Sequence, residues 1–209
     1  QQLVRDSYTR IKDGEITAVN VLTRLLRLSQ LTGGFLREDD SEQPIQISDA
    51  KLTALGDIVD SAAQDGKKLV VIARFLPEID AIMRMLEKKA IGYSLISGEV
   101  KDRDEQVQRF QADPDTTVFV GQIATAGLGI TLTAADTMVF YSLDYSMSNF
   151  EQAKARIHRV GQRNPCTYLY LVAVGTVDEK VLQALCEKAD LAKVLIDEYR
   201  AGRSPFQSD

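Results

Sequence analysis

The sequence contains few of the residues that build metal centres and secreted domains. Its 209 residues include one histidine and two cysteines, Cys166 and Cys186, which form no CxxC pair. A structural zinc site needs four such ligands, and a disulfide framework needs more cysteines than this. We therefore assign no metal ligands and expect a reducing compartment.

Long apolar runs are also missing. No stretch approaches the roughly 20 apolar residues that cross a bilayer, and no secretory signal stands at the start, so we expect no membrane contact. The first residue is Gln1 rather than Met, which favours a piece of a longer polypeptide. The content of 44% apolar and 26% charged residues is ordinary for a globular domain. The net charge of −5 does not indicate nucleic-acid binding, although a local basic strip would permit it.

Two common phosphate-binding motifs are absent. The nearest match to a P-loop, GxxxxGK[ST], lies at residues 61–68, where Ser61 replaces the first glycine and Lys68 replaces the final Ser or Thr. A dinucleotide fingerprint, GxGxxG, begins at residues 127–129 and fails at Leu132. No apolar strand ends in an Asp-Glu pair that would hold magnesium. The chain therefore lacks the parts that cradle a triphosphate and its metal.

Short apolar runs alternate with amphipathic segments along the chain. Residues 68–73, KLVVIA, are typical of a strand buried on both faces. Further strands are predicted at 92–97, 117–120, 137–141 and 166–172, and helices at 15–30, 48–63, 77–89, 101–111, 148–160 and 176–199, with a polar loop at 37–43. This alternation predicts an α/β fold with a mostly parallel sheet. Ligands of such sheets bind at the carboxyl ends of the strands.

One segment, residues 148–163 (SNFEQAKARIHRVGQR), surrounds the single histidine with arginines. A helix over this segment would place Gln152, Arg156 and Arg159 on one face. Two guanidiniums on a rigid face can grip phosphate. Taken alone, the segment is equally well explained as a solvated arginine face on a surface helix.

These segments resemble the C-terminal RecA-like lobe of SWI/SNF-like ATPases in helicase superfamily two. Residues 152–162, QAKARIHRVGQ, are similar to the family's motif VI, QAxDRxHRxGQ. Residues 126–136, AGLGITLTAAD, are similar to motif V, GGLGINLTAAD. Residues 68–75 look like motif IV, and residues 175–179 like the downstream GTVEE segment. The resemblance covers nearly the whole chain.

The resemblance implies a three-layer αβα RecA-like domain with a mostly parallel sheet and additional flanking helices. Residues 1–65 would be a helical lead-in from a missing first motor lobe, 66–176 the RecA-like lobe, and 177–209 a C-terminal helix and tail packed on it. The motif variants look closer to bacterial or phage members. A cytoplasmic, nucleoid-associated location would follow, or a nuclear one in a eukaryote.

The resemblance also implies roles for individual residues. In this family two lobes sandwich ATP and Mg²⁺, which the first lobe mainly holds. Arg156 and Arg159 would be arginine fingers reaching the γ-phosphate. The expected support for the ATP site is Gln152, Gly127 and Gly129. The expected contacts to the DNA backbone are Ser97, Gly98, Gln122, Thr125 and Tyr145.

Three positions depart from the family pattern. Ala155 stands where an aspartate usually precedes the first finger, so a partner that would orient Arg156 is lost. Ala124 replaces an arginine of motif V, which removes one expected DNA contact. Tyr145 takes the aromatic position of the family's DWNP segment, where contact with DNA and packing at the edge of the core are equally expected.

His158 is expected to pack between the lobes rather than act as an acid or base.

We thus expect the second motor lobe of an ATP-dependent translocase on double-stranded DNA, partnered by the N-terminal lobe of the same polypeptide. The fragment alone is expected to be monomeric and inactive as an ATPase. The alternative is a non-catalytic module, a stand-alone lobe that binds DNA or a partner. A Rossmann-type NAD enzyme is disfavoured by the failed fingerprint.

Overall fold

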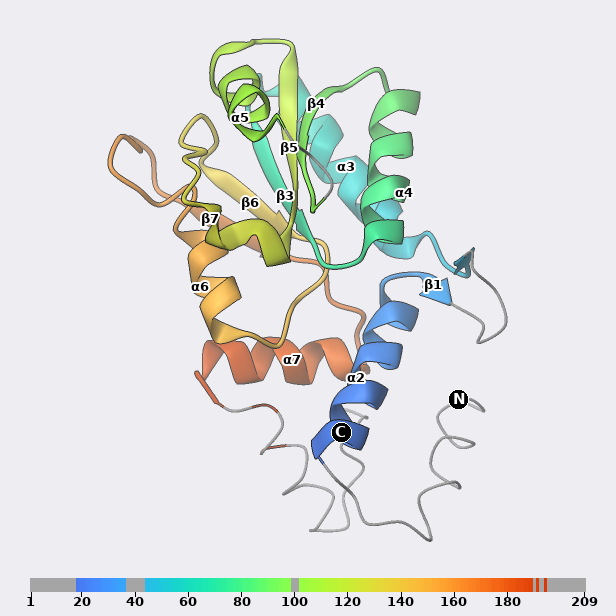
Figure 1. The fold of residues 1–209 in the computed structure, drawn as a ribbon. Coiled ribbons are helices and arrows are strands. Elements are labelled where there is room, and N and C mark those ends of the chain that lie inside the picture. The colour runs from blue at the N-terminus through green and yellow to red at the C-terminus, as the bar shows by residue number, and fades with distance from the viewer. Residues whose placement is uncertain (1–17, 37–43, 99–101, 190, 192–193, 195–209) are drawn as a thin grey trace, which may run out of the picture.

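A central sheet of five parallel strands organises the fold (Figure 1). The computed structural model describes residues 18–36, 44–98, 102–189, 191 and 194, so the predicted loop at 37–43 lies outside the described residues. The strand order is β4-β5-β3-β6-β7. The strands are β3 (Leu69–Ala73), β4 (Gly92–Ile96), β5 (Thr116–Gln122), β6 (Thr137–Phe140) and β7 (Thr167–Tyr170). The predicted α/β class with a parallel sheet is confirmed.

Helices cover both faces of this sheet and make the three layers (Figure 1). One face carries α3 (Ala50–Gln64) and α4 (Leu76–Lys88). The other carries α2 (Ala18–Thr32), α5 (Arg103–Ala112), α6 (Met147–Lys154) and α7 (Val177–Cys186). A two-stranded antiparallel pair, β1 (Phe35–Leu36) with β2 (Ile45–Gln46), follows α2. No helix in the described part of the chain is long and apolar enough to span a bilayer.

The central strand β3 explains why the core has two halves. Val70 and Ile72 face the cluster that contains Phe119 and Phe140. Val71 faces the opposite cluster, because successive side chains of a strand point to opposite faces. All five residues of β3 are buried, as the continuous apolar run at 68–73 predicts.

The predicted helix over 148–160 is wrong in its second half. It ends at Lys154, and Arg156 and Arg159 lie in the turns that follow. The regular ladder breaks at Arg156, whose backbone N–H bonds to the carbonyl of Ala153 at 3.0 Å, while the carbonyl of Gln152 accepts from Nε of Arg156 at 3.0 Å. The carbonyl of Arg156 then accepts a hydrogen bond from the backbone of Leu132 at 2.9 Å. The arginines therefore share no regular helix face with Gln152.

Of the predicted helix over 176–199, α7 ends at Cys186, and residues 190, 192–193 and 195–199 lie outside the described residues. Lys188 has a left-handed backbone with φ of 55°, and the backbone N–H of Ala189 donates to the carbonyl of Ala184 at 2.9 Å. This is a common way to close a helix. The division of the chain at residues 65 and 176 stays a prediction, although α3, from the predicted lead-in, packs on the sheet beside α4.

Asp178 joins segments that are far apart in the sequence. Its Oδ1 accepts a hydrogen bond from the hydroxyl of Thr32 at 2.7 Å. Its Oδ2 pairs with Nζ of Lys51 at 2.5 Å and accepts from the backbone of Ala173 at 3.1 Å. One buried carboxylate thus ties the end of α2, the start of α3 and the start of α7, where sequence alone suggests only a charge at a helix N-terminus.

Removing this carboxylate should destabilise the domain. Asp178→Asn leaves Lys51, whose side chain is only 10% exposed, as an uncompensated buried charge, which costs about 3 kcal/mol. The matched control is Asp60→Asn, because Asp60 pairs with Lys89 at the same 2.5 Å but on the surface, with side chains 44% and 31% exposed. Its cost should stay below about 1 kcal/mol. Urea unfolding of both variants tests this, and equal losses would contradict it.

Candidate functional site

After α6 the chain returns to the motif V segment, residues 126–136, and two arginines hold it there. Nη1 of Arg159 donates to the carbonyl of Gly129 at 2.8 Å, to the carbonyl of Ile130 at 3.3 Å and to the hydroxyl of Thr131 at 3.2 Å. Nη1 of Arg156 donates to the same carbonyl of Ile130 at 3.4 Å. The structure therefore brings the two predicted finger residues together around one backbone oxygen.

The electrostatics of this pair favour an anion. Arg156 is half-buried and Arg159 exposed. Burial lowers the pKa of Arg156, and the neighbouring charge of Arg159 lowers it further. Within the described part of the chain, neither guanidinium lies at ion-pair distance from a carboxylate, and Ala155 supplies none. Two adjacent positive charges compensated only by carbonyl dipoles would be stabilised by a bound anion.

The predicted supporting residues take different positions around this pair. Gly129 has φ of 71° and ends the short 3-10 helix η1 (Ile123–Leu128), which turns its carbonyl toward Arg159. Gly127 lies inside η1. The backbone carbonyl of Gln152 accepts from Nε of Arg156 at 3.0 Å, while its side-chain amide bonds Ser148 within α6 at 2.9 Å.

Gln162 is a residue of this site that had no assigned role. Its amide nitrogen donates to the carbonyl of Ala135 at 2.7 Å and to that of Ile157 at 3.3 Å. Its amide oxygen accepts from the backbone N–H groups of Arg163 and Asn164, at 2.9 and 3.0 Å. The glutamine therefore fixes the turn that carries both arginines. Gln162 is the last residue of the segment that resembles motif VI, and that resemblance is the signal in the sequence that could have pointed to this role.

Beside this turn lies an open pocket of about 380 Å³. Its lining is His158, Arg159, Val160, Gln162, Arg163 and Asn164. His158 is exposed, and the side chain of Val160 is 98% exposed. Packing of His158 between two lobes stays a prediction.

Four of the predicted DNA contacts gather at the carboxyl ends of β4 and β5. The backbone N–H of Gly98 donates to the side-chain oxygen of Gln122 at 3.3 Å, and the hydroxyl of Thr125 donates to the carbonyl of Gln122 at 2.6 Å. Ser97 is buried, whereas Gly98 is exposed. The amide of Gln122 also donates to the carbonyl of Arg74 at 3.4 Å, so this group connects to the loop after β3.

Tyr145, the fifth predicted DNA contact, lies half-buried against another part of the same loop. Its hydroxyl and that of Ser29 lie 2.9 Å apart. The guanidinium of Arg74 stacks 3.9 Å from the centre of its ring, lies 5.1 Å from the ring of Phe75 and 3.7 Å from Asp144. Burial raises the pKa of the Tyr145 phenol. The tyrosine is therefore joined to the other predicted contacts through Arg74.

The strongest electrostatic feature of this edge, Glu78, was not predicted. Glu78 is 1% exposed. Its Oε2 accepts from the backbone N–H groups of Arg74 and Phe75, at 3.2 and 3.1 Å, and from the hydroxyl of Ser142 at 2.5 Å. Burial raises the pKa of this carboxyl to about 7, against these hydrogen bonds. An acid in the first turn of a helix is ordinary in sequence, so no signal distinguished it.

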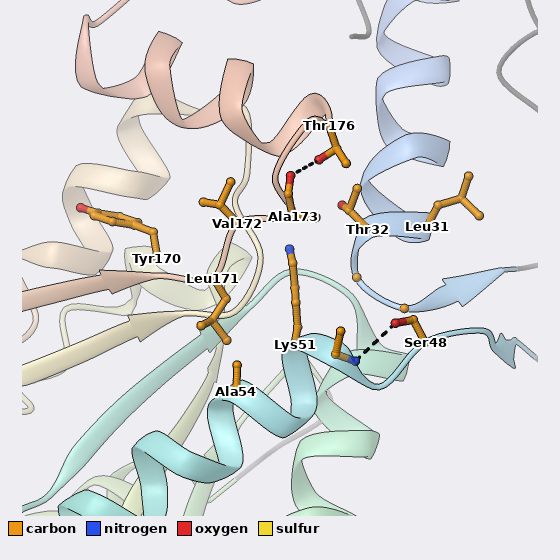
Figure 2. A pocket seen from close by; sticks show the side chains of 13 residues that line it. Leu31, Thr32, Ser48, Lys51, Ala54, Tyr170, Leu171, Val172, Ala173 and Thr176 are labelled. Carbon is orange, nitrogen blue, oxygen red and sulfur yellow. Dashed lines mark hydrogen bonds between the residues drawn. The ribbon is translucent and has the colours of Figure 1, made fainter. Parts of the chain in front are cut away.

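A further pocket, of about 540 Å³, opens where β7 ends (Figure 2). Figure 2 shows Lys51 rising from α3 between Thr32 and Ala173, toward the start of α7. The lining includes the apolar residues Ala54, Leu171 and Val172. Among the described residues no cluster of three or more histidines, cysteines or acids could hold a metal.

The sequence matches the family model of the helicase conserved C-terminal domain over residues 50–161, more than half of the chain. The chain belongs to the helicase C-terminal domain family. The match includes both arginines and the motif V backbone that they contact, and the resemblance stated above is confirmed.

Relatives of this helicase C-terminal domain include long ATPases. It is 34% identical over 152 residues to a chromatin-remodeling ATPase INO80 of Cryptococcus neoformans, covering 72% of this chain and 9% of that protein. It is 26% identical over 167 residues to the human lymphoid-specific helicase, covering 78% of this chain and 20% of that protein. The chain thus spans a small part of these relatives.

Solved structures share the fold. The Sulfolobus solfataricus SWI2/SNF2 ATPase core in complex with dsDNA matches with a TM-score of 0.73 and 24% identity, over 94% of this chain and 45% of that chain. The C-terminal domain of a Sulfolobus solfataricus SWI2/SNF2 ATPase matches with a TM-score of 0.66 and 20% identity, over 88% and 77%. The predicted RecA-like architecture is therefore confirmed.

Glu78 should make the stability of the helicase C-terminal domain depend on pH. Because its pKa rises from 4.5 to about 7 on folding, the folded state binds the proton more tightly than the unfolded chain does. The contribution of this proton to the free energy of unfolding is fully present below pH 4.5 and is lost as the pH rises toward 7. The free energy of unfolding changes by roughly 3 kcal/mol over this range. Glu78→Gln should remove this slope in urea titrations across that range. An unchanged slope would contradict the assignment.

Proposed function

We propose that this chain is the second motor lobe of an ATP-dependent DNA translocase, with Arg156 and Arg159 as its arginine fingers. The observation that carries the proposal is the pair of guanidiniums on the carbonyl of Ile130. No carboxylate among the described residues neutralises them. Such a pair would stabilise the negative charge of a transferring phosphoryl group.

The residues present fit a polyphosphate anion better than they fit its metal. The arginines and the turn fixed by Gln162 would hold the outer phosphate of ATP, which supplies the group to be transferred. The motif VI turn offers no carboxylate oxygen to Mg²⁺, which prefers carboxylates and water. We infer that the metal and the rest of the nucleotide are held by a first lobe of the same polypeptide, as the small share of its relatives that the chain spans supports.

On the carboxyl edge of the sheet, the group of Gly98, Gln122 and Thr125 would contact the phosphate backbone of duplex DNA. Its exposed Gly98 and polar side chains can position a backbone without reading sequence. The structural similarity to an ATPase core in complex with dsDNA supports contact with duplex DNA. With Tyr145 joined to the group through Arg74, these contacts would act as one surface. A bacterial or phage source and the cellular location remain predictions.

The finger assignment is tested in the full-length protein by Arg156→Ala and Arg159→Ala. Each should lower DNA-stimulated ATP turnover by about 10³-fold or more, because positive charge is lost where phosphoryl charge develops. Affinity for a labelled DNA duplex should remain within a few-fold of wild type, since neither residue lies on the proposed DNA surface.

Arg163→Ala is the matched control. Arg163 belongs to the same turn and is exposed, but among the described residues its guanidinium does not join Arg156 and Arg159 on the carbonyl of Ile130. This variant should turn over ATP at nearly the wild-type rate. Wild-type rates in the Arg156 and Arg159 variants as well would remove the finger assignment, and equal losses in all three would show a general effect of charge.

The isolated chain should not hydrolyse ATP, with or without duplex DNA, because it supplies only one side of the nucleotide site. A steady-state phosphate-release assay on the purified chain measures this. Turnover that is stimulated by DNA and lost in Arg156→Ala would place the whole site within this chain and overturn the two-lobe proposal.

A further inference from the structure

Three segments meet at Glu78, and their contacts use its two oxygens differently. Oε2 accepts the three hydrogen bonds from Arg74, Phe75 and Ser142, so it fixes the loop after β3 against the end of β6. Oε1 is buried and has no hydrogen-bond partner among the described residues. A buried carboxylate oxygen left without a partner is costly. The protein keeps Glu78 despite this cost, which suggests that the carboxyl does more than cap α4.

The free oxygen faces the end of α2. A Cβ built on Gly33 would lie 2.1 Å from Oε1 of Glu78, a distance that no real side chain could occupy. The absence of a side chain at Gly33 therefore allows the last turn of α2 to rest directly on the carboxyl. The hydroxyl of Tyr141 donates to the carbonyl of Gly33 at 3.5 Å, which holds this turn from the sheet.

The loop on the other side of Glu78 leads to the proposed DNA surface. Glu78 binds the backbone of Arg74, the carbonyl of Arg74 accepts from Gln122 at 3.4 Å, and the same amide accepts from Gly98 at 3.3 Å. The side chain of Arg74 stacks on Tyr145. From Glu78, contacts through Arg74 thus run to both parts of that surface, and the end of α2 meets the carboxyl by close packing at Gly33.

We propose that Glu78 is a positioning residue that couples the seating of α2 to the loops that face DNA. The inference rests on the proposed function, in which α2 is the part of the chain that leads in from the first lobe. A shift of α2 would act on Glu78 at Gly33, and Glu78 would pass it to the backbone of Arg74. The carboxyl itself touches no DNA.

Ionisation of Glu78 gives the coupling a signature that simple packing lacks. The groups that interact electrostatically with the carboxyl are Lys51 from α3 and Tyr141 at the end of β6, and Arg74 stands on its own loop. With a pKa of about 7, the carboxyl changes charge near neutral pH. The strength with which Oε2 holds the loop should then change with pH, because a carboxylate is the stronger acceptor.

The first test compares Glu78→Gln with wild type in the full-length protein. The KM for duplex DNA in the ATPase assay and the direct affinity for a labelled duplex are measured from about pH 6 to about pH 8. Wild type should bind more tightly as the pH rises, and the glutamine variant should lose this dependence. Its KM for DNA should rise by about fivefold at the upper end, with kcat at saturating DNA retained. Asp80→Asn, an exposed acid on the same helix, is the control.

The second test is a double-mutant cycle with Gly33→Ala. In the wild-type background the new methyl group meets Oε1 and should weaken DNA binding as Glu78→Gln does. In a Glu78→Ala background the oxygen is gone and only the backbone carbonyl of Ser29, 3.2 Å from the new Cβ, remains close. The same change should then have a smaller effect on DNA binding, and the difference between the two backgrounds measures the coupling. If Gly33→Ala fails to fold, the pH comparison decides alone.

Unchanged DNA affinity and an unchanged pH profile in Glu78→Gln, with additive effects in the cycle, would overturn this inference. Arg156→Ala is measured in parallel to separate the coupling role of Glu78 from the proposed motor function. If Arg156→Ala loses ATP turnover while Glu78→Gln behaves as wild type, the proposed function stands and only the coupling is removed. A wild-type protein that binds no duplex would remove both.

Discussion

The arrangement of the candidate site depends on the return of the chain after α6. The backbone bond between Leu132 and Arg156 holds the motif VI turn on the motif V segment after the helix has ended at Lys154. Both guanidiniums then converge on one carbonyl. A longer helix would satisfy more backbone groups locally, but it would carry Arg159 away from Gly129. Tertiary contacts therefore outweigh helical propensity in this segment, and they place the positive charges of Arg156 and Arg159 side by side.

Two buried carboxylates organise the rest of the domain, and each has a different electrostatic balance. Asp178 has a cation, a hydroxyl and a backbone N–H as partners, so its charge is compensated. Glu78 has three donors on one oxygen and none on the other. The first carboxylate fixes the helices to one another, whereas the second remains able to take up a proton. Both lie at the end of α2, where Asp178 bonds Thr32 and Glu78 lies against Gly33.

The sequence was a good guide to the sheet and to the identity of the charged turn. The five strands follow from apolar runs whose burial leaves little choice of structure, as at 68–73. The pairing of the two arginines follows from the motif resemblance, whereas the shared helix face predicted from their spacing is wrong. The return of the motif VI turn and the surroundings of Glu78 could not be predicted, because both depend on partners distant in sequence. Leu132 bonds Arg156, and Ser142 and Gly33 lie against Glu78, and no local pattern reveals such partners.

The bonds made by Asp178 also constrain the order in which the domain can fold. They join residues 127 and 146 positions apart, to Lys51 and to Thr32. Contacts of such long sequence separation form late, after much chain entropy has been lost. During synthesis, α2 and α3 emerge long before the carboxylate that fastens them. Chains that stop before residue 178 lack α7, so the apolar side of α2 that shares a core cluster with it should stay partly exposed.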